Sequence, residues 1–360
     1  MGFKETFLKK GSEPYFIAEI GINHNGLFEL ARRMIDASKE SGADAVKFQK
    51  RNLEALVMSG VEIEIPTGYL SKDENDLPTE EKAFGTWTYP DKRLELSDGQ
   101  VLDLWKYTET KEMDFIVSPW EERSVDFLAE NMAKVIKLAS IDATNYQFCE
   151  YIAKKKIPVI VSTGMSNWHQ LTTTYNIFKD AGCPMMFLHC TSAYPCPIED
   201  KHLKCLPIMQ DMFAMDVGFS GHGVGVEGTL GAITLGARVI EKHVTLSRSM
   251  SGPDQAASLE FDEFKSLIKQ SKNMVRAMGN GRKDFLSSEE VLHGVLAKKI
   301  VTIMSVKKGE SLKAEMIRTM VTKQKSGLLP DRYYEILGKT TARDLPKNHV
   351  LEIGDLVIGS

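Results

Sequence analysis

The chain has 360 residues, which exceeds the ~250 to 300 beyond which one hydrophobic core usually splits, so a large domain and a smaller one are expected. Its 42% hydrophobic and 26% charged residues are typical of a globular protein. A formal net charge of -4 gives no electrostatic reason to expect a nucleic acid or an anionic membrane as a partner.

The N-terminal segment, MGFKETFLKKGSEPYF, lacks the hydrophobic core of a secretory signal, and no apolar run in the chain approaches the ~18 residues of a membrane span. Gly2 and Thr6 match the pattern M-G-x-x-x-[ST], but this pattern is short and occurs by accident, so we expect no myristoylation. Five cysteines without a CxxC pair argue against a disulfide framework and against a thiolate zinc site. These features favour a cytoplasmic protein.

Eight short runs rich in β-forming residues recur along the chain, and segments with the apolar spacing of helices lie between them. The runs cover residues 15–21, 43–49, 113–119, 134–140, 158–164, 184–190, 216–221 and 238–244. They are continuously apolar, which fits parallel strands that are buried on both faces. A last helix is expected over 261–279. Eight strand–helix units predict a (β/α)8 TIM barrel. The alternative, an open doubly wound sheet, lacks a GxGxxG sequence after the first run.

Two parts of the chain depart from this rhythm. Residues 50–112 are too long for one helix, and their Pro, Gly and aromatic residues predict an insertion over the barrel mouth, with a disordered surface loop as the alternative. After residue 279 the pattern changes to short strands and turns, which predicts a compact α+β module. We therefore expect a barrel domain over 1–280 and a second domain over 281–360. The second domain is basic, with 14 Lys and Arg against 10 Asp and Glu.

Polar side chains stand at the carboxyl ends of all eight runs, where a barrel of this kind builds its active site. These residues are Glu19, Lys47, Gln49, Ser118, Lys137, Ser140, Ser162, His189, Thr191, Ser220, His222, Glu241 and His243. A buried charge without a partner is strongly unfavourable, so this ring is expected to surround a charged ligand. Lysines and hydroxyls together predict an anion cradle, that is, an anion-binding site, with phosphate as the expected ligand.

The two histidines at adjacent strand ends, His222 and His243, are suited to bind one divalent metal ion and to leave coordination positions open. The structural alternative is that His222 caps a turn and His243 makes a hydrogen bond in the core. For Lys47 and Lys137 the alternatives are structural salt bridges, with Glu19 as a partner, or a Schiff-base aldolase. The second alternative arises because desolvation in the apolar stretch AVKFQ would lower the pKa of Lys47.

The chain resembles the sialic acid synthase (N-acetylneuraminate synthase) family over almost its whole length. The stretches that carry the resemblance are IAEIGINHNG (17–26), GADAVKFQ (42–49), STGMS (162–166), LHCTSAYPCPIED (188–200), GFSGH (218–222), GARVIEKHVTL (236–246) and GPDQAASLE (252–260). The resemblance implies a (β/α)8 barrel followed by an antifreeze-like (SAF) domain, which residues 284–360 match. It also implies a domain-swapped homodimer, in which the SAF domain of one chain caps the barrel of the other.

The activity that the resemblance implies is condensation of phosphoenolpyruvate with the open-chain aldehyde of an N-acylated amino sugar, with release of phosphate. N-Acetylmannosamine is the leading acceptor. Synthesis of legionaminic or pseudaminic acid, or of a 9-phosphate product from a 6-phosphorylated sugar, is the alternative. Alternatives of another class are a Schiff-base aldolase or lyase and a non-catalytic protein that binds sugar.

The resemblance also assigns roles to single residues. Positions that match the phosphoenolpyruvate site are Lys47, Ser118, Lys137, Ser140, Ser162 and Ser220, and Ser192 joins this binding set. Those that match ligands of Mn²⁺ or Mg²⁺ are His222 and His243, and Gln49, Tyr194 and Asp254 match residues around the sugar and the metal-bound water. Family members direct an arginine of the SAF domain at the sugar, and Lys323, in the matching stretch TKQKSG (322–327), is the candidate for that contact here. The expected catalytic set is Glu19, Lys47, Glu241 and Asp142, the last at a position where glutamate is common. Trp120 and residues 60–95 are expected to shape the sugar pocket.

Overall fold

The computed structural model describes residues 13–66, 86–131, 133–223 and 225–357, so the segment that holds Gly2 and Thr6 lies outside the described residues. The chain folds as two compact units, Met1–Asn280 and Gly281–Ser360. Among the described residues, no helix is both long enough and apolar enough to span a bilayer.

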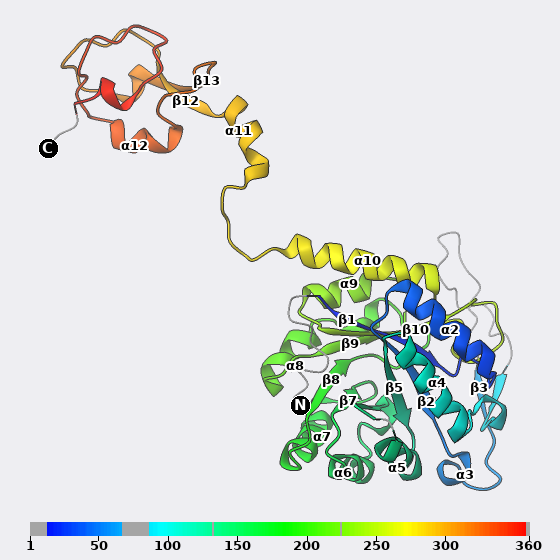
Figure 1. The fold of residues 1–360 in the computed structure, drawn as a ribbon. Coiled ribbons are helices and arrows are strands. Elements are labelled where there is room, and N and C mark those ends of the chain that lie inside the picture. Colours follow the sequence, from blue (N-terminus) through cyan, green and yellow to red (C-terminus); the bar gives the residue numbers. More distant parts are fainter. Residues whose placement is uncertain (1–12, 67–85, 132, 224, 358–360) are drawn as a thin grey trace. The chain divides into compact units, whose positions relative to one another are not determined.

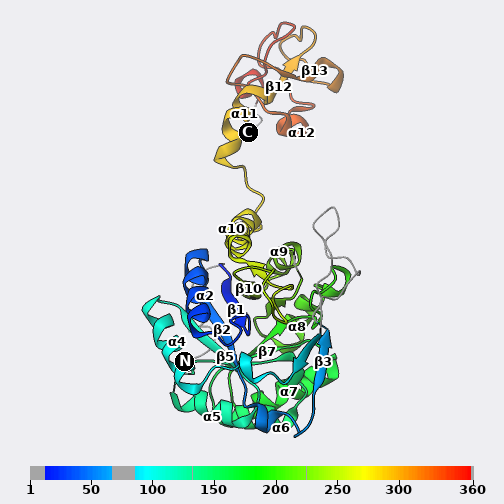
Figure 2. The ribbon, with the colours of Figure 1, turned by 90° about the vertical axis from the view of Figure 1, so that its right-hand side faces the viewer.

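The first unit is a closed barrel of eight parallel strands with helices around it (Figures 1 and 2). In order around the barrel the strands are β1 (Tyr15–Gly21), β2 (Ala45–Lys50), β5 (Asp114–Pro119), β6 (Ile136–Leu138), β7 (Val159–Ser162), β8 (Met185–His189), β9 (Gly218–Gly221) and β10 (Val239–Thr245). Pairing of β1 with β10 closes the sheet. The short strand β11 (Leu259–Glu260) pairs in parallel with the end of β10. The predicted fold class is confirmed, and each strand begins and ends within two residues of its predicted range.

Helices alternate with the strands and bury their apolar faces against the outside of the barrel. They are α2 (Phe28–Ser41), α4 (Asp98–Thr110), α5 (Glu122–Asn131), α6 (Tyr146–Lys154), α7 (Trp168–Asp180), α8 (Cys205–Phe213), α9 (Glu227–Thr234) and α10 (Phe261–Met278). Local sequence fixes several of their ends. Ser97 with Gln100, and Asn167 with Gln170, form capping boxes at the starts of α4 and α7. Gly42, with a φ of 90°, ends α2 in the left-handed conformation that glycine adopts without strain.

The interior of the barrel changes from apolar to polar along each strand. A buried cluster that includes Ile17, Ile116 and Ile160 fills one part of it. Side chains two residues apart on a strand point to the same face, so Glu19, Ser118 and Ser162 follow these isoleucines inside the barrel, nearer its carboxyl end. The apolar part of the interior forms a core, and the polar part, at the carboxyl end of the barrel, is where a site can form.

Residues 50–112 contain additional structure and also a regular barrel helix. After β2 come α3 (Leu53–Leu56) and a two-stranded antiparallel sheet of β3 (Ile63–Pro66) and β4 (Thr86–Tyr89). The prediction that the whole interval is an insertion is wrong, because α4 packs on α2 and β5 as the second helix of the barrel. A Cβ on Gly26 would lie 1.8 Å from the carbonyl oxygen of Arg93. The end of the insertion therefore packs tightly on the loop after β1, at the carboxyl end of the barrel.

The second unit has a core of its own and little regular structure. Its strands β12 (Lys298–Thr302) and β13 (Ile317–Val321) pair in antiparallel fashion, and its helices are α11 (Glu290–Leu296) and α12 (Tyr333–Ile336). Buried residues such as Ile300, Leu312 and Leu351 form the core. The assignment of this unit as a SAF domain stays a prediction.

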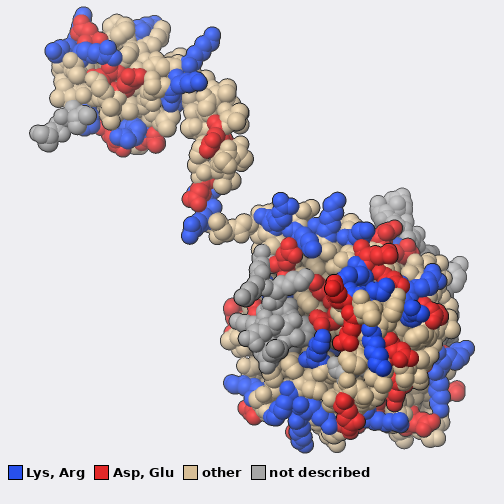
Figure 3. All heavy atoms as spheres, viewed as in Figure 1, with Lys and Arg blue, Asp and Glu red and all other residues tan. Residues whose placement is uncertain are grey.

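Acidic and basic side chains are interspersed on the surface of each unit that faces the viewer in Figure 3. On that side no broad area of the barrel carries one sign of charge alone. The charges that bear on function are instead the buried ones.

Close packing between strands gives a prediction for Gly218, the first residue of β9. A Cβ there would lie 2.3 Å from Leu188 Cδ2 and 2.5 Å from the carbonyl oxygen of Val239. Gly218→Ala is therefore expected to lower the free energy of unfolding by about 1–3 kcal/mol, seen as a lower urea midpoint at unchanged slope. The matched control is Gly99→Ala in the first turn of α4, where a Cβ meets nothing within 4 Å. Equal midpoints for the two variants would show that β9 can move aside.

Candidate active site

A cluster of buried charges occupies the carboxyl end of the barrel. Lys47 Nζ, from β2, lies 3.0 Å from Glu19 Oε2 on β1 and 3.5 Å from Glu241 Oε1 on β10. Lys137 Nζ, from β6, lies 4.0 Å from Glu241 Oε2. All four side chains are buried, so two ammonium groups and two carboxyl groups meet in an environment of low dielectric constant. The two predicted lysines face the same space, and Glu241 stands between them.

Burial and the neighbouring charges set the protonation of this cluster. Desolvation raises the pKa of Glu19 to about 7, against the opposing effect of Lys47. Desolvation alone would lower the pKa of Lys47, but Glu19 and Glu241 outweigh it, and the pKa is raised. The expectation that the apolar stretch AVKFQ lowers the pKa of Lys47 is therefore wrong. For Glu241 the two lysines outweigh desolvation and lower the pKa, whereas desolvation lowers the pKa of Lys137.

The raised pKa of Glu19 predicts a pH dependence of stability. The native state holds a proton that the unfolded chain releases near the ordinary glutamate pKa of 4.5, so this contribution to stability is present below that pH and is lost as the pH rises through about 7. Glu19→Gln keeps the side chain neutral. The wild-type free energy of unfolding, relative to that of Glu19→Gln, is expected to fall between pH ~4.5 and ~7 in urea titrations. The control is Glu29→Gln on the surface of α2. A constant difference between wild type and Glu19→Gln across this range would contradict the prediction.

Serine hydroxyls surround the two ammonium groups. Lys47 Nζ donates to Ser118 Oγ at 3.3 Å, and Lys137 Nζ donates to Ser162 Oγ at 2.6 Å. Because each hydroxyl oxygen accepts from an ammonium group, its own proton stays available for a ligand. Ser220 differs, since its hydroxyl donates to Glu241 Oε1 at 3.0 Å. Cations and oriented O–H donors together suit a phosphate or a carboxylate.

Ser140 and Ser192 belong to a neighbouring group at the ends of β6 and β8. Ser140 Oγ accepts from the backbone N–H of Gly164 at 3.2 Å and lies 3.1 Å from Cys190 Sγ. Ser192 Oγ is buried and has no hydrogen-bond partner within the described part of the chain, so it is free to bind a ligand. A Cβ on Gly164 would lie 2.1 Å from this oxygen. Sequence reasoning missed Gly164 and Cys190, although the glycine in STGMS was a signal of close approach.

The predicted metal ligands project into the same region, with the ring centroids of His222 and His243 5.6 Å apart. His222 Nδ1 lies 2.9 Å from the carbonyl oxygen of Thr191. A carbonyl can only accept, so Nδ1 carries the proton and Nε2 keeps its lone pair. This Nε2 lies 3.1 Å from the hydroxyl of Tyr194. Desolvation lowers the pKa of His222 to about 4 and that of His243 well below its ordinary value. Both rings are therefore neutral, which is the form that binds metal.

These residues fit a divalent metal ion. His243 Nδ1 is buried and lacks a hydrogen-bond partner among the described residues, with Asp254 Oδ2 3.8 Å away, which is unusual for a structural histidine. No group of three or more His, Cys, Asp or Glu side chains in the described segments is arranged to hold a metal ion. The protein would thus supply two imidazoles and leave the other coordination positions to substrate and water.

Three further predicted residues meet around Gly21 at the end of β1. A Cβ on this glycine would lie 3.1 Å from Glu19 Oε1, 3.4 Å from Gln49 Nε2 and 3.6 Å from Asp254 Oδ2. Desolvation raises the pKa of Asp254 to about 6, while Arg51 opposes the shift. This polar group adjoins the histidines on the side of the site where Arg51 lies.

The side chains of His189, Thr191 and Asp142 do not contact the cluster within the described residues, although the backbone carbonyl of Thr191 accepts a hydrogen bond from His222. His189 Nε2 lies 2.9 Å from the carbonyl oxygen of Lys201, and Thr191 Oγ1 donates to that of Asp200, so the expected ring of polar residues is incomplete at β8. Asp142 is partly buried in a 3-10 turn and accepts from Asn145. Lys323 is exposed in the second unit. The roles predicted for Asp142 and Lys323 stay predictions.

The closed barrel, with buried lysines, hydroxyls and two imidazoles gathered at its carboxyl end, has the arrangement of a (β/α)8 enzyme. The model of the NeuB family matches residues 34–283. The chain belongs to this family and is an enzyme of the sialic acid synthase type.

Several known proteins are similar to the chain over most of their length. N,N'-diacetyllegionaminic acid synthase of Campylobacter jejuni is 34% identical over 341 residues, which cover 93% of this chain and 98% of the relative. Human N-acetylneuraminate-9-phosphate synthase is 35% identical over 91% of this chain and 89% of the relative. Pseudaminic acid synthase of C. jejuni is 34% identical over 95% of this chain and 96% of the relative. The crystal structure of an N-acetylneuraminic acid synthetase from Leptospira borgpetersenii matches with a TM-score of 0.66 and 28% identity, over 78% and 91% of the two chains.

Proposed function

We propose that this protein condenses phosphoenolpyruvate with the aldehyde of an N-acylated amino sugar, releases phosphate and forms a nine-carbon 2-keto acid. The observation that carries the proposal is the buried cluster of Lys47 and Lys137 with their serine partners, beside two neutral imidazoles. Relatives named as synthases of three such acids support it.

The anionic substrate would bind to Lys47 and Lys137 and to the hydroxyl protons of Ser118 and Ser162. With Glu19 protonated, the two ammonium groups exceed the one remaining carboxylate, and the cluster attracts an anion. The pKa of Glu19 near 7 makes this excess available at neutral pH. Buried donors that are already oriented lose little free energy when charge develops on the departing phosphate.

The reaction forms a bond between C3 of phosphoenolpyruvate and the aldehyde carbon. Water adds at C2, and the adduct loses phosphate. Glu19, whose pKa lies near neutrality, would exchange a proton with the sugar oxygen or with the attacking water. His222 and His243 would hold Mn²⁺ or Mg²⁺, and such an ion supplies Lewis-acid polarisation of the aldehyde.

The acceptor sugar would lie on the side of Gln49, Asp254 and Arg51. Arg51 is buried, pairs with Glu95 and lies 5.6 Å from the ring of Trp120. The indole N–H of Trp120 is buried without a hydrogen-bond partner in the described residues, so it can donate to a sugar oxygen or acyl group. N-Acetylmannosamine is the first acceptor to test. The 6-deoxy diacetamido sugars and a 6-phosphorylated sugar are the alternatives.

The test is release of phosphate by the purified full chain from phosphoenolpyruvate, Mn²⁺ or Mg²⁺ and a panel of N-acylated amino sugars. Release with one sugar identifies the acceptor. A folded chain that releases none with any sugar would instead be a protein that binds sugar without turnover. Borohydride with pyruvate separates the aldolase class, since it would trap a lysine only if a Schiff base forms. The raised pKa of Lys47 disfavours a Schiff base at that residue, and because the pKa of Lys137 is lowered, the trapping experiment decides the question for Lys137.

The proposal extends to assembly and location. The second unit, as a SAF domain, would cap the barrel of a partner chain in a domain-swapped homodimer, with Lys323 reaching the sugar. Sedimentation of the full chain gives its oligomeric state. If Lys323 contacts the sugar, Lys323→Ala raises the KM for sugar and leaves that for phosphoenolpyruvate unchanged. The cytoplasm is the proposed compartment.

A further inference from the structure

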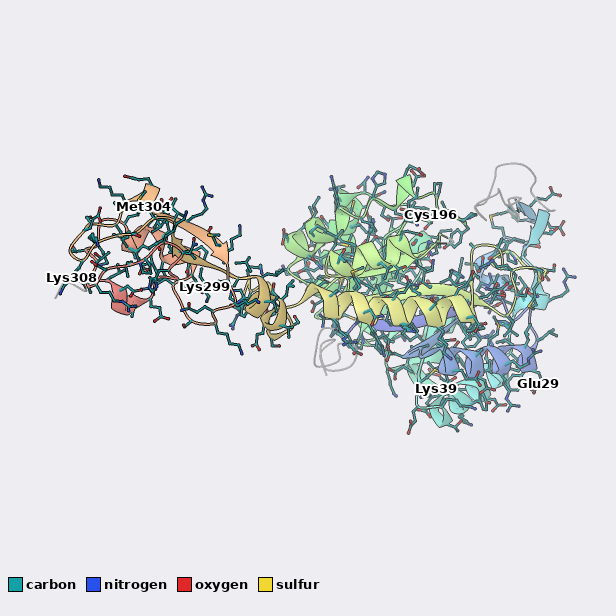
Figure 4. All side chains as sticks on the ribbon, turned by 90° about the horizontal axis from the view of Figure 1, so that it is seen from above. Glu29, Lys39, Cys196, Lys299, Met304 and Lys308 are labelled. Atoms are coloured by element: carbon teal, nitrogen blue, oxygen red, sulfur yellow. The ribbon has the colours of Figure 1, made fainter. Side chains whose placement is uncertain are left out.

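A small cavity lies on the outer side of the barrel wall, between β9, β10 and the first turn of α9. Its lining includes Cys196, Lys201, Gly223, Gly228, Thr229 and Lys242, and Cys196 is labelled in Figure 4. Glu241 and His243 point into the barrel, so Lys242 between them points outward into this cavity. Ser220 and His222, which belong to the candidate active site, also line this cavity.

Two buried lysines meet in the cavity. Lys201 and Lys242 are 8% and 2% exposed. Lys242 Nζ donates to the carbonyl oxygen of Gly223 at 2.5 Å, and a Cβ on Gly223 would lie 3.1 Å from Lys201 Nζ. Within the described residues, neither lysine forms an ion pair with a carboxylate, and Lys201 Nζ makes no hydrogen bond. Two amino groups thus lie close together in the lining of the cavity, and an anion between them would stabilise their charged forms.

The start of α9 adds further positive character. Val226 precedes the helix and its side chain provides no capping hydrogen bond, so backbone N–H groups of the first turn are left to other partners. The helix dipole places partial positive charge at the same end. The side chain of Glu227 is exposed and lies over Gly225, one of the residues that line the cavity. It supplies the negative charge of this first turn from the solvent side.

Glycines allow this arrangement. A Cβ on Gly228 would lie 2.6 Å from Lys201 Cδ and 3.2 Å from its Nζ, so only glycine leaves room for the lysine against the helix start. Glycine-rich loops before a helix let backbone N–H groups approach an anion closely. We propose that the cavity binds a small monatomic anion, such as chloride, between Lys201, Lys242 and the first turn of α9. It is a second anion site, separate from the one inside the barrel.

Thermal unfolding of the full chain with added chloride or phosphate tests the proposal, with gluconate salts holding ionic strength constant. An anion that binds only the folded state should raise the wild-type Tm by roughly 2–4 °C or more near saturation. Lys201→Met should lose the part of the shift that arises here. The matched control, Lys204→Met, removes an exposed charge close in sequence and should keep it. Phosphate and chloride that also bind inside the barrel act equally on both variants.

Crystals of the wild-type protein soaked in bromide give a second readout that does not depend on how a variant folds. An anomalous peak between Lys201 and Lys242 supports the proposal. Equal anion-dependent shifts in Lys201→Met and Lys204→Met, or bromide crystals without a peak there, would overturn it. A shift that phosphate alone produces, and that Lys201→Met loses, would contradict the proposal, because the cavity has room for little more than a monatomic ion.

Discussion

Lys137→Met is expected to raise the KM for phosphoenolpyruvate by about 10²-fold or more, and to leave the KM for the sugar within a few fold. Lys137 Nζ holds Ser162 Oγ at 2.6 Å and faces Glu241 at 4.0 Å, so methionine removes a cation and the donor that orients this hydroxyl. Methionine has a similar length and lacks the charge, and Glu241 keeps Lys47 as its partner at 3.5 Å. The fold should therefore persist. Steady-state phosphate release with each substrate varied in turn measures both constants.

Lys134→Met is the matched control for this change, because Lys134 lies close in sequence and its side chain is mostly exposed, 3.7 Å from Asp114. Exposed pairs of this kind contribute little. The control should keep wild-type constants. An unchanged KM for phosphoenolpyruvate in a folded Lys137→Met protein would show that the anion binds elsewhere.

His243→Ala is expected to lower the affinity for Mn²⁺ by at least ~10²-fold and to reduce turnover to background, because it removes one of the two imidazoles that the proposal assigns to the ion. The ring makes no hydrogen bond through Nδ1 in the described residues, so its loss leaves no protein partner of that nitrogen unsatisfied. Binding of Mn²⁺ to the free protein, followed by the loss of the free-ion paramagnetic resonance signal, separates metal affinity from catalysis.

The matched control for His243 is His189→Ala. His189 is also buried, but its ring bonds the carbonyl oxygen of Lys201, so the control should lose stability and keep its affinity for Mn²⁺. If His243→Ala kept the wild-type Mn²⁺ affinity or turnover, His243 would not be a metal ligand. The structural alternative, a histidine of the core, would then hold.

The barrel was predictable because continuous apolar runs and helical spacing are local signals, and each strand was placed within two residues. The helix α4 within residues 50–112 was not predicted. The composition of this interval is irregular, and the capping box of Ser97 at the start of the helix was overlooked. The inclusion of His189 in the polar ring was avoidable. Met186 and Leu188 face the interior of β8, so the alternation of side chains already placed His189 on the other face.

The sequence predicted which residues lie at the candidate site, but it did not predict which of them contact one another. Strand ends placed Lys47, Lys137 and Glu241 on one rim, but the pairing of Lys47 with Glu241 depends on closure of the barrel, which brings β10 beside β1, the neighbour of β2. The sign of the pKa shift of Lys47 follows from these pairings, and a single apolar stretch could not reveal it. The group of Gly164, Cys190 and Ser140 comes from three separate strand ends and has no local signature.

Glu241 contacts both ammonium groups of the cluster, so one substitution there alters the two at once. Libraries designed to retune acceptor preference should therefore leave this position fixed. Diversity is better placed at Arg51, Trp120 and their surroundings, where a failed variant would still bind phosphoenolpyruvate. Screening could then separate variants that reject a sugar from those that have lost the chemistry altogether.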